Sequence, residues 1–81
     1  MNVRSIQKKY VGKLAFVRGE ISGFKLPADF VTFSDGDVLL FTGIKKDKNS
    51  PSWMTVQVLS KFGLVFLGCN SVMLKLVFKY V

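Results

Sequence analysis

The chain contains no histidine, one cysteine and five acidic residues among its 81 residues. Without histidine it cannot form a histidine-dependent serine or cysteine triad, nor a histidine-based zinc site. The single cysteine, Cys69, also excludes an intrachain disulfide and a cysteine-based metal cluster. Because disulfides are scarce where thiols are kept reduced, we expect a cytoplasmic protein in which Cys69 is a buried structural residue.

A shortage of carboxylates limits acid–base catalysis in the same way. A catalytic pair would need two of five residues to converge: Glu20, Asp29, Asp35, Asp37 and Asp47. Three of these lie in stretches with the composition of turns or loops, where aspartate ordinarily serves the turn. The glycines also lack the spacing of a phosphate-binding loop. A serine–lysine arrangement stays open, but nothing favours it, so we expect no enzyme and no bound cofactor or metal ion.

Long apolar runs of the kind that target a chain to membranes are also missing. No stretch of signal-peptide length follows the first ten residues, so a secretion signal is not expected. Residues 62–81 would be long enough to cross a bilayer, but residues 68–71 predict a turn near the middle. Lys75 would also be costly in hydrocarbon. We therefore expect no membrane span.

What the chain has in excess is positive charge and apolar side chains. Twelve Lys and Arg against five Asp and Glu give a net charge of +7, and 49% of the residues are hydrophobic. This content is enough for one modest core, so residues 1–81 are expected to form a single small β-rich domain. The charge predicts a basic outer surface that attracts polyanions over long distances. With so many apolar residues, one face is expected to be more apolar than usual.

The first third of the chain predicts a helix and a bent strand. Val3, Ile6 and Tyr10 recur at three- and four-residue spacing, which predicts a helix over residues 3–11. The apolar residues of the next segment, residues 13–24, are interrupted by two glycines. Such glycines mark bends, so this segment predicts one long strand that curls around a corner, or two short strands.

The remaining chain predicts further antiparallel strands. Asp35 and Gly36, at the centre of residues 30–41, are typical of a two-residue hairpin turn. Residues 44–52 are polar and charged and predict a loop. The alternation over residues 53–59 predicts a half-exposed strand, with Trp53 on its polar side.

The C-terminal stretch predicts a second hairpin. Its strands would be residues 64–67 and 72–81, joined across residues 68–71. In the last strand Met73, Val77 and Val81 would share one face with two lysines, a pattern that suggests partial cover on both sides. The cover would come either from the N-terminal helix or from a second copy of the protein, that is, a homodimer through the C-terminal strands.

These elements predict a mainly β fold: a short N-terminal helix, then a bent antiparallel sheet of five to seven strands in a small, partly closed barrel. The order of elements is similar to that of SH3-like and Sm-like barrels. An oligonucleotide-binding barrel would need a helix where residues 45–52 leave no room for one.

Two basic segments are the candidate binding residues. Three lysines of the predicted loop could contact phosphate oxygens, and the adjacent Trp53 offers a ring on which an unpaired base could stack. Four more cations lie on the predicted helix and just after it. Whether they form one groove with the loop lysines depends on where the helix packs. The candidate residues are Arg4, Lys8, Lys9, Lys13, Lys45, Lys46, Lys48 and Trp53.

Function is therefore expected to be binding. No predicted helix resembles a reader of the DNA major groove, so RNA or single-stranded nucleic acid is favoured over duplex DNA. The alternative is a small viral or mobile-element regulator that binds and inhibits or adapts a host protein with an acidic surface, such as an enzyme that handles RNA or DNA.

Overall fold

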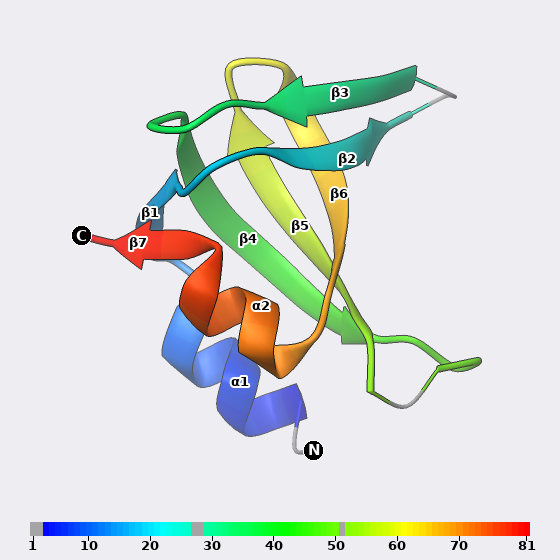
Figure 1. The fold of residues 1–81 in the computed structure, drawn as a ribbon. Helices are drawn as coiled ribbons and strands as arrows, with labels where there is room; N and C mark the ends of the chain where they lie inside the picture. The colour runs from blue at the N-terminus through cyan, green and yellow to red at the C-terminus, as the bar shows by residue number, and fades with distance from the viewer. Residues whose placement is uncertain (1–2, 27–28, 51) are drawn as a thin grey trace.

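The structure, a computed structural model, describes residues 3–26, 29–50 and 52–81. Over these residues the chain is mainly β, as the sequence predicts. Seven antiparallel strands form one sheet that curls into a half-barrel, with a short helix before it (Figure 1). The elements in chain order are α1 (Val3–Tyr10), β1 (Leu14–Val17), β2 (Ile21–Lys25), β3 (Asp29–Phe33), β4 (Val38–Lys46), β5 (Met54–Ser60), β6 (Gly63–Cys69), α2 (Ser71–Leu76) and β7 (Phe78–Tyr80).

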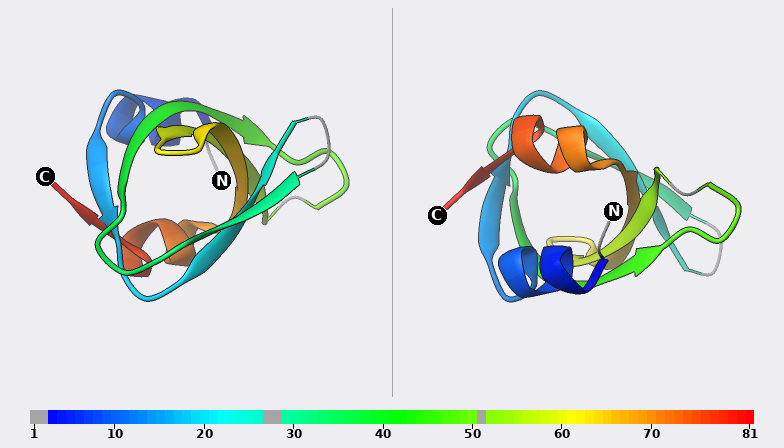
Figure 2. Two further views of the ribbon diagram at one scale, coloured as in Figure 1. Left: turned by 90° about the horizontal axis from the view of Figure 1, so that it is seen from above. Right: turned by 90° about the horizontal axis from the view of Figure 1, so that it is seen from below.

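The strand order across the sheet is β3-β2-β6-β5-β4-β1-β7, so β3 and β7 are its two edges. Views along the barrel show the sheet curling into an incomplete ring, with α1 and α2 on opposite sides of one end (Figure 2). The core inside this ring is apolar and receives side chains from every element. Its buried residues are Tyr10, Ala15, Val17, Ile21, Phe33, Leu39, Phe41, Ile44, Met54, Val56, Val58, Val65, Leu67, Cys69, Leu74 and Phe78.

The predicted N-terminal helix is confirmed as α1. Val3 and Ile6 pack against the core and Tyr10 is buried in it, so the three- and four-residue spacing marks the inward face. The Tyr10 ring lies 6.4 Å from that of Phe41 on β4. One turn earlier, the Gln7 side chain donates a hydrogen bond to the backbone carbonyl of Ile44. The helix therefore runs antiparallel to β4, with its first turn toward the strand's last residues.

The predicted bend is also confirmed, as the two short strands β1 and β2. The first pairs with β4 and β7, and the second pairs with β3 and β6, so the corner at residues 18–20 lets one stretch of chain line two sides of the barrel. Gly23 on β2 leaves room for two core side chains of the neighbouring strand β6. A Cβ at Gly23 would lie 2.5 Å from a side-chain carbon of Leu67 and 2.6 Å from one of Val65.

The predicted hairpin over residues 30–41 is wrong. The turn at Asp35 and Gly36 forms, with Gly36 at a φ of 90°, but the strands on either side do not pair with each other. Instead β3 pairs with β2, and β4 pairs with β1 and β5. Backbone bonds explain the difference, because Gly36 N–H donates to Val17 and Val17 N–H donates to Asp37. The turn is held against the corner between β1 and β2. The strand before the turn, β3, therefore pairs with β2, and the strand after it, β4, pairs with β1.

The predicted loop over residues 44–52 begins too early. β4 continues through Lys46, and Lys45 and Lys46 pair with Thr55 and Met54 of β5. The predicted strand after the loop is confirmed as β5. It joins β6 through a tight turn in which Ser60 pairs with Gly63.

The predicted C-terminal hairpin is wrong as well. Residues 71–76 form α2, and only the last residues return to the sheet, as β7 paired with β1 rather than β6. The Asn70 side chain accepts a hydrogen bond of 2.8 Å from the Met73 N–H, which is the usual role of asparagine at a helix N-cap. Apolar residues at 73, 74, 77 and 78 fit a helical turn as well as a strand. Leu74 is buried, whereas Leu76 is exposed.

Candidate functional site

Three of the predicted site lysines lie at the end of β4 and at the start of the loop that follows it. Lys45 and Lys46 end β4, Lys48 follows in the loop, and all three side chains are exposed. The Asp47 N–H donates to the carbonyl of Trp53, and the Asp47 carboxylate accepts from the Asn49 N–H at 2.9 Å. The loop is therefore closed by its own hydrogen bonds, with the lysine side chains directed to solvent.

Trp53 lies at the foot of this loop. Its backbone N–H donates a hydrogen bond of 2.9 Å to the backbone carbonyl of Ser50, and the residue is 39% exposed. By the alternation along β5 it belongs to the outer, polar side together with Thr55, as the sequence predicts. Trp53 is thus partly exposed next to the lysines, and its contact with nucleic acid stays a prediction.

The other predicted cations lie on or after α1. Arg4, Lys8 and Lys9 are exposed on the helix, and Lys13 is exposed just before β1. The Lys9 ammonium lies 5.4 Å from the centroid of the Tyr10 ring, a cation–π distance. The side of the helix that does not face the core is therefore basic.

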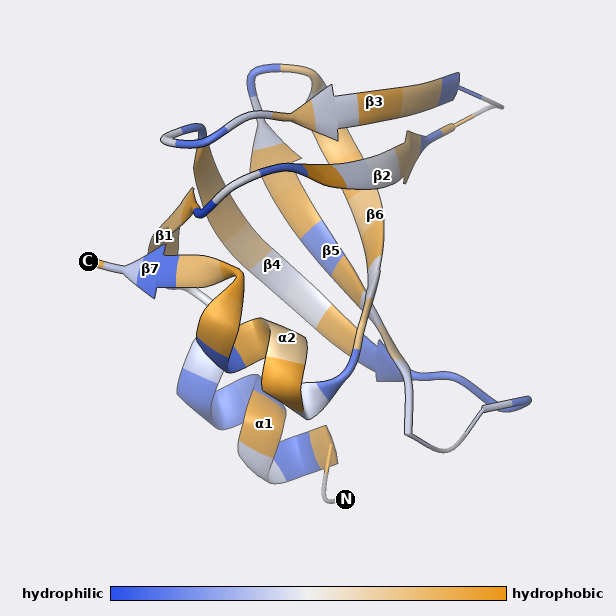
Figure 3. Cartoon of the chain, in the orientation of Figure 1, coloured by the Kyte–Doolittle hydropathy of each residue, from blue (hydrophilic) through white to orange (hydrophobic). Residues whose placement is uncertain are grey.

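The packing of α1 along β4 sets the first turn of the helix and the β4 lysines at the same end of the strand. Because Gln7 contacts Ile44, the residue before Lys45, the helical turn that carries Arg4 lies toward the end of β4. Figure 3 shows hydrophilic residues along α1 and at the end of β4. Lys13 lies at the opposite end of the helix, where its carbonyl accepts from the Phe41 N–H. We call Arg4, Lys45, Lys46 and Lys48, which lie toward this end of β4, the basic surface.

The sequence did not reveal three phenylalanines that are neighbours across the strands on the outer face of the sheet. Phe24 on β2 is the direct partner of both Phe66 on β6 and Phe30 on β3, and opposed residues in antiparallel strands project from the same face. Their face is the outer one, since Gly23 beside Phe24 faces the core. These residues become neighbours only through the pairing of three strands. Their positions in the sequence therefore give no sign that they share a surface. We call Phe24, Phe30 and Phe66 the aromatic row.

A second apolar set crosses the other half of the outer face. Leu14, Leu40, Leu59 and Leu64 are successive partners on β1, β4, β5 and β6. Three of them are 42–49% exposed. We call these four residues the aliphatic row. Together the two rows make the outer face more apolar than usual, as the composition predicts.

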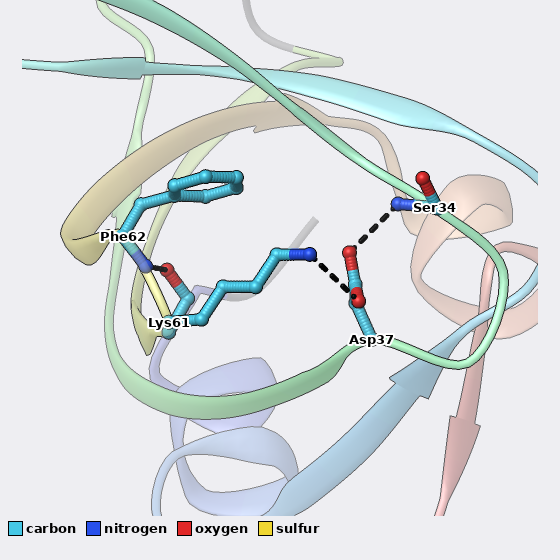
Figure 4. Close-up of polar contacts among 5 residues, drawn as sticks. Ser34, Asp37, Lys61 and Phe62 are labelled. Carbon is cyan, nitrogen blue, oxygen red and sulfur yellow. Dashed lines mark hydrogen bonds and ion pairs between the residues drawn. The ribbon is translucent and has the colours of Figure 1, made fainter.

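The aspartates of the Ser34–Asp37 turn serve structure, as the sequence predicts. The Asp35 carboxylate accepts from the Gly19 N–H and the Asp37 carboxylate from the Ser34 N–H, each at 2.8 Å. Asp37 also forms an ion pair of 3.1 Å with Lys61 of the β5–β6 turn (Figure 4). The Ser34 hydrogen bond first, and Lys61 second, lower the pKa of Asp37. This contact joins two turns at one end of the barrel.

Cys69 is confirmed as a buried structural residue. Its side chain is fully buried at the end of β6, and desolvation raises the pKa of the thiol to about 11. Among the residues that the structure describes, no group of three potential metal ligands occurs and no pocket is found. None of the described helices is long and apolar enough to cross a membrane.

Comparison of the chain with protein-family models, with curated proteins and with solved structures finds no match.

Proposed function

We propose that this chain is a non-enzymatic, cytoplasmic protein that binds nucleic acid, with RNA or another single strand preferred over duplex DNA. The observation that carries the proposal is the packing of α1 along β4, which sets the basic helix beside the end of β4 with its lysines. Cations gathered at one end of a strand can contact several phosphates of the same nucleic acid, which supports the proposal.

The preference for single strands rests on what surrounds the basic surface. α1 is short and its apolar face packs against the core, so it is poorly suited to enter a DNA groove. Trp53, next to the lysine loop, exposes an aromatic ring that could stack on an unpaired base. Lys8 and Lys9, in the last turn of the helix, and Lys13 beyond it could contact a longer strand.

The test compares two pairs of lysines that change the net charge equally. The variant K46Q/K48Q removes charge from the loop, and K75Q/K79Q removes the same charge from α2 and β7. We expect the loop variant to bind a fluorescent single-stranded RNA about fivefold or more weakly, and the control to bind within about twofold of the wild type. Equal weakening by both pairs would show that only net charge matters and would contradict the assigned surface.

A protein partner is the second candidate, and the aliphatic row favours it. A row of leucines on four neighbouring strands, three of them exposed, is typical of an interface core, and the basic surface would suit an acidic partner. The chain would then act as a small viral or mobile-element regulator of a host protein. A partner that remains bound after nuclease treatment, and is lost in the variant L59E, would support this candidate over nucleic acid.

We also propose a homodimer through the C-terminal region. The predicted long C-terminal strand does not form, so the proposal rests on α2 and β7 instead. Val72 and Leu76 lie one turn apart on α2 and are 58% and 64% exposed, and β7 is an edge strand. A second copy could cover both features. Light scattering at micromolar concentration checks this proposal: the mass of two chains supports the dimer, and the mass of one chain contradicts it.

A further inference from the structure

The aromatic row is exposed in a way that core packing does not require. Phe30 is 81% exposed, and its ring lies 5.5 Å from that of Phe24 in an edge-to-face arrangement of 69°. Phe24 and Phe66 are half-buried beside it. Phe30 therefore presents a large apolar aromatic side chain to solvent, with the half-buried Phe24 ring against it.

Polar groups and bare backbone border the row. On one side, the hydroxyls of Ser22 and Thr32 lie 3.2 Å apart on the same outer face. Gln57 on β5 is the direct partner of Phe66. Two residues beyond Phe66, about 7 Å along the strand, Gly68 is exposed, and nothing lies within 4 Å of the position that its Cβ would occupy. Hydrogen-bonding groups and room for close approach therefore adjoin the rings.

The row is also connected to the basic surface. Thr55 on β5 is the partner of both Gly68 on β6 and Lys45 on β4, and all three residues are exposed. Lys45, Thr55 and Gly68 lie side by side across three strands. Along each strand they are the next outward-facing position after the row of paired residues that contains Gln57 and Phe66. A strand of nucleic acid that follows the outer face could place bases on the row and phosphates at Lys45.

We propose that Phe24, Phe30 and Phe66 form a base-stacking platform for a single-stranded nucleic acid whose phosphates are bound by the basic surface. The inference rests on the proposed function. Charge selects this occupant, because a chain of net charge +7, with Lys45 on the outward-facing line next to that of Phe66, complements a polyanion that carries flat apolar bases. The contrast with the aliphatic row supports the assignment, since leucines offer no ring on which a base can stack.

The test measures the affinity of a fluorescein-labelled single strand of about 12 uridines, a length within the range that such sites cover, at low salt. In F30L and F66L we expect binding to weaken about fivefold or more, because leucine preserves apolar volume but cannot stack. F30Y keeps the ring and should bind within about twofold of the wild type. F16L is the matched control, because Phe16 is 38% exposed on β1, outside the row.

Stacking and phosphate contacts are separated by their salt dependence. The slope of log affinity against log salt reflects the number of phosphates that the protein's cations neutralise. F30L removes no cation and should leave this slope unchanged, whereas K46Q/K48Q should make it shallower. If the wild type binds the RNA but F30L and F66L bind equally well, the platform is wrong and the proposed function stands. If F16L weakens binding as much as F30L, the platform is also wrong. If the wild type does not bind at all, both proposals fail.

Discussion

Cys69 illustrates how completely the half-barrel excludes water at the end of β6. Its thiol is fully buried, and desolvation raises its pKa to about 11. At a pH near 8 only about one thiol in a thousand is therefore ionised, and the thiolate is the reactive form. A residue in this position contributes to packing, like the valines and leucines around it.

We predict that Cys69 reacts with a thiol reagent only when the protein unfolds. At pH 8 the labelling rate of the native protein should be very slow, and it should rise in urea in step with the loss of β structure. The measurement is absorbance with a chromogenic disulfide, followed in parallel with circular dichroism. Fast, stoichiometric labelling in the absence of urea would contradict the burial of the thiol.

Asp37 gives the stability of the protein a dependence on acid pH. The hydrogen bond from Ser34 and the ion pair with Lys61 hold its pKa below the ordinary value of 3.8 in the folded state. A lowered pKa stabilises the fold above the unfolded-state pKa, and this stabilisation is lost as pH falls through the folded-state value.

We therefore expect D37N to remove part of the decline in unfolding free energy that the wild type shows below a pH of about 3.8. K61M should remove a smaller part, because the Ser34 hydrogen bond remains. Urea unfolding at a series of pH values measures both effects. Identical pH profiles for the wild type and D37N would show that the Asp37 contacts do not contribute.

At the scale of elements, α2 depends on Asn70 for its start. The helix is only six residues long, and the Asn70 side chain binds one of its unpaired N–H groups. Short helices gain little from intrinsic propensity, so the cap and the burial of Leu74 carry most of the stabilisation.

We predict that N70A lowers the free energy of unfolding by about 1 kcal/mol, whereas N70D retains most of the cap. The control is S71A, one residue later, whose side chain is not the cap. Denaturant unfolding monitored by circular dichroism measures the differences. An N70A midpoint equal to that of the wild type would mean that the cap is not formed in solution.

The elements also show which parts of the fold the sequence could predict. α1 and the β1–β2 bend were predictable, because apolar spacing and glycine act locally. The partners of β3 and β4 were not, because the Asp35–Gly36 turn is the same whether the strands pair with each other or with the bent chain. The sequence did not predict α2, because the apolar residues of this segment fit the two-residue period of a strand as well as the period of a helix. Asn70, directly before the helix, is a residue type that favours a helix N-cap.

At the scale of the whole molecule, the structure separates two kinds of surface. The basic surface follows α1 and the end of β4, and the two apolar rows cover the outer face of the sheet. Composition could predict that both surfaces exist, because it sets charge and apolar content. It could not predict the aromatic row, whose members come from three strands that meet only through long-range pairing.

The central claim is that the basic surface binds the phosphates of a single strand, and salt dependence tests it most directly. If four or five phosphates are neutralised, log affinity against log salt should fall with a slope of about −3, and K46Q/K48Q should make it shallower by about 1.4. Fluorescence anisotropy over a salt series measures both slopes. Salt-independent binding, or no binding at about 50 mM salt, would contradict the claim.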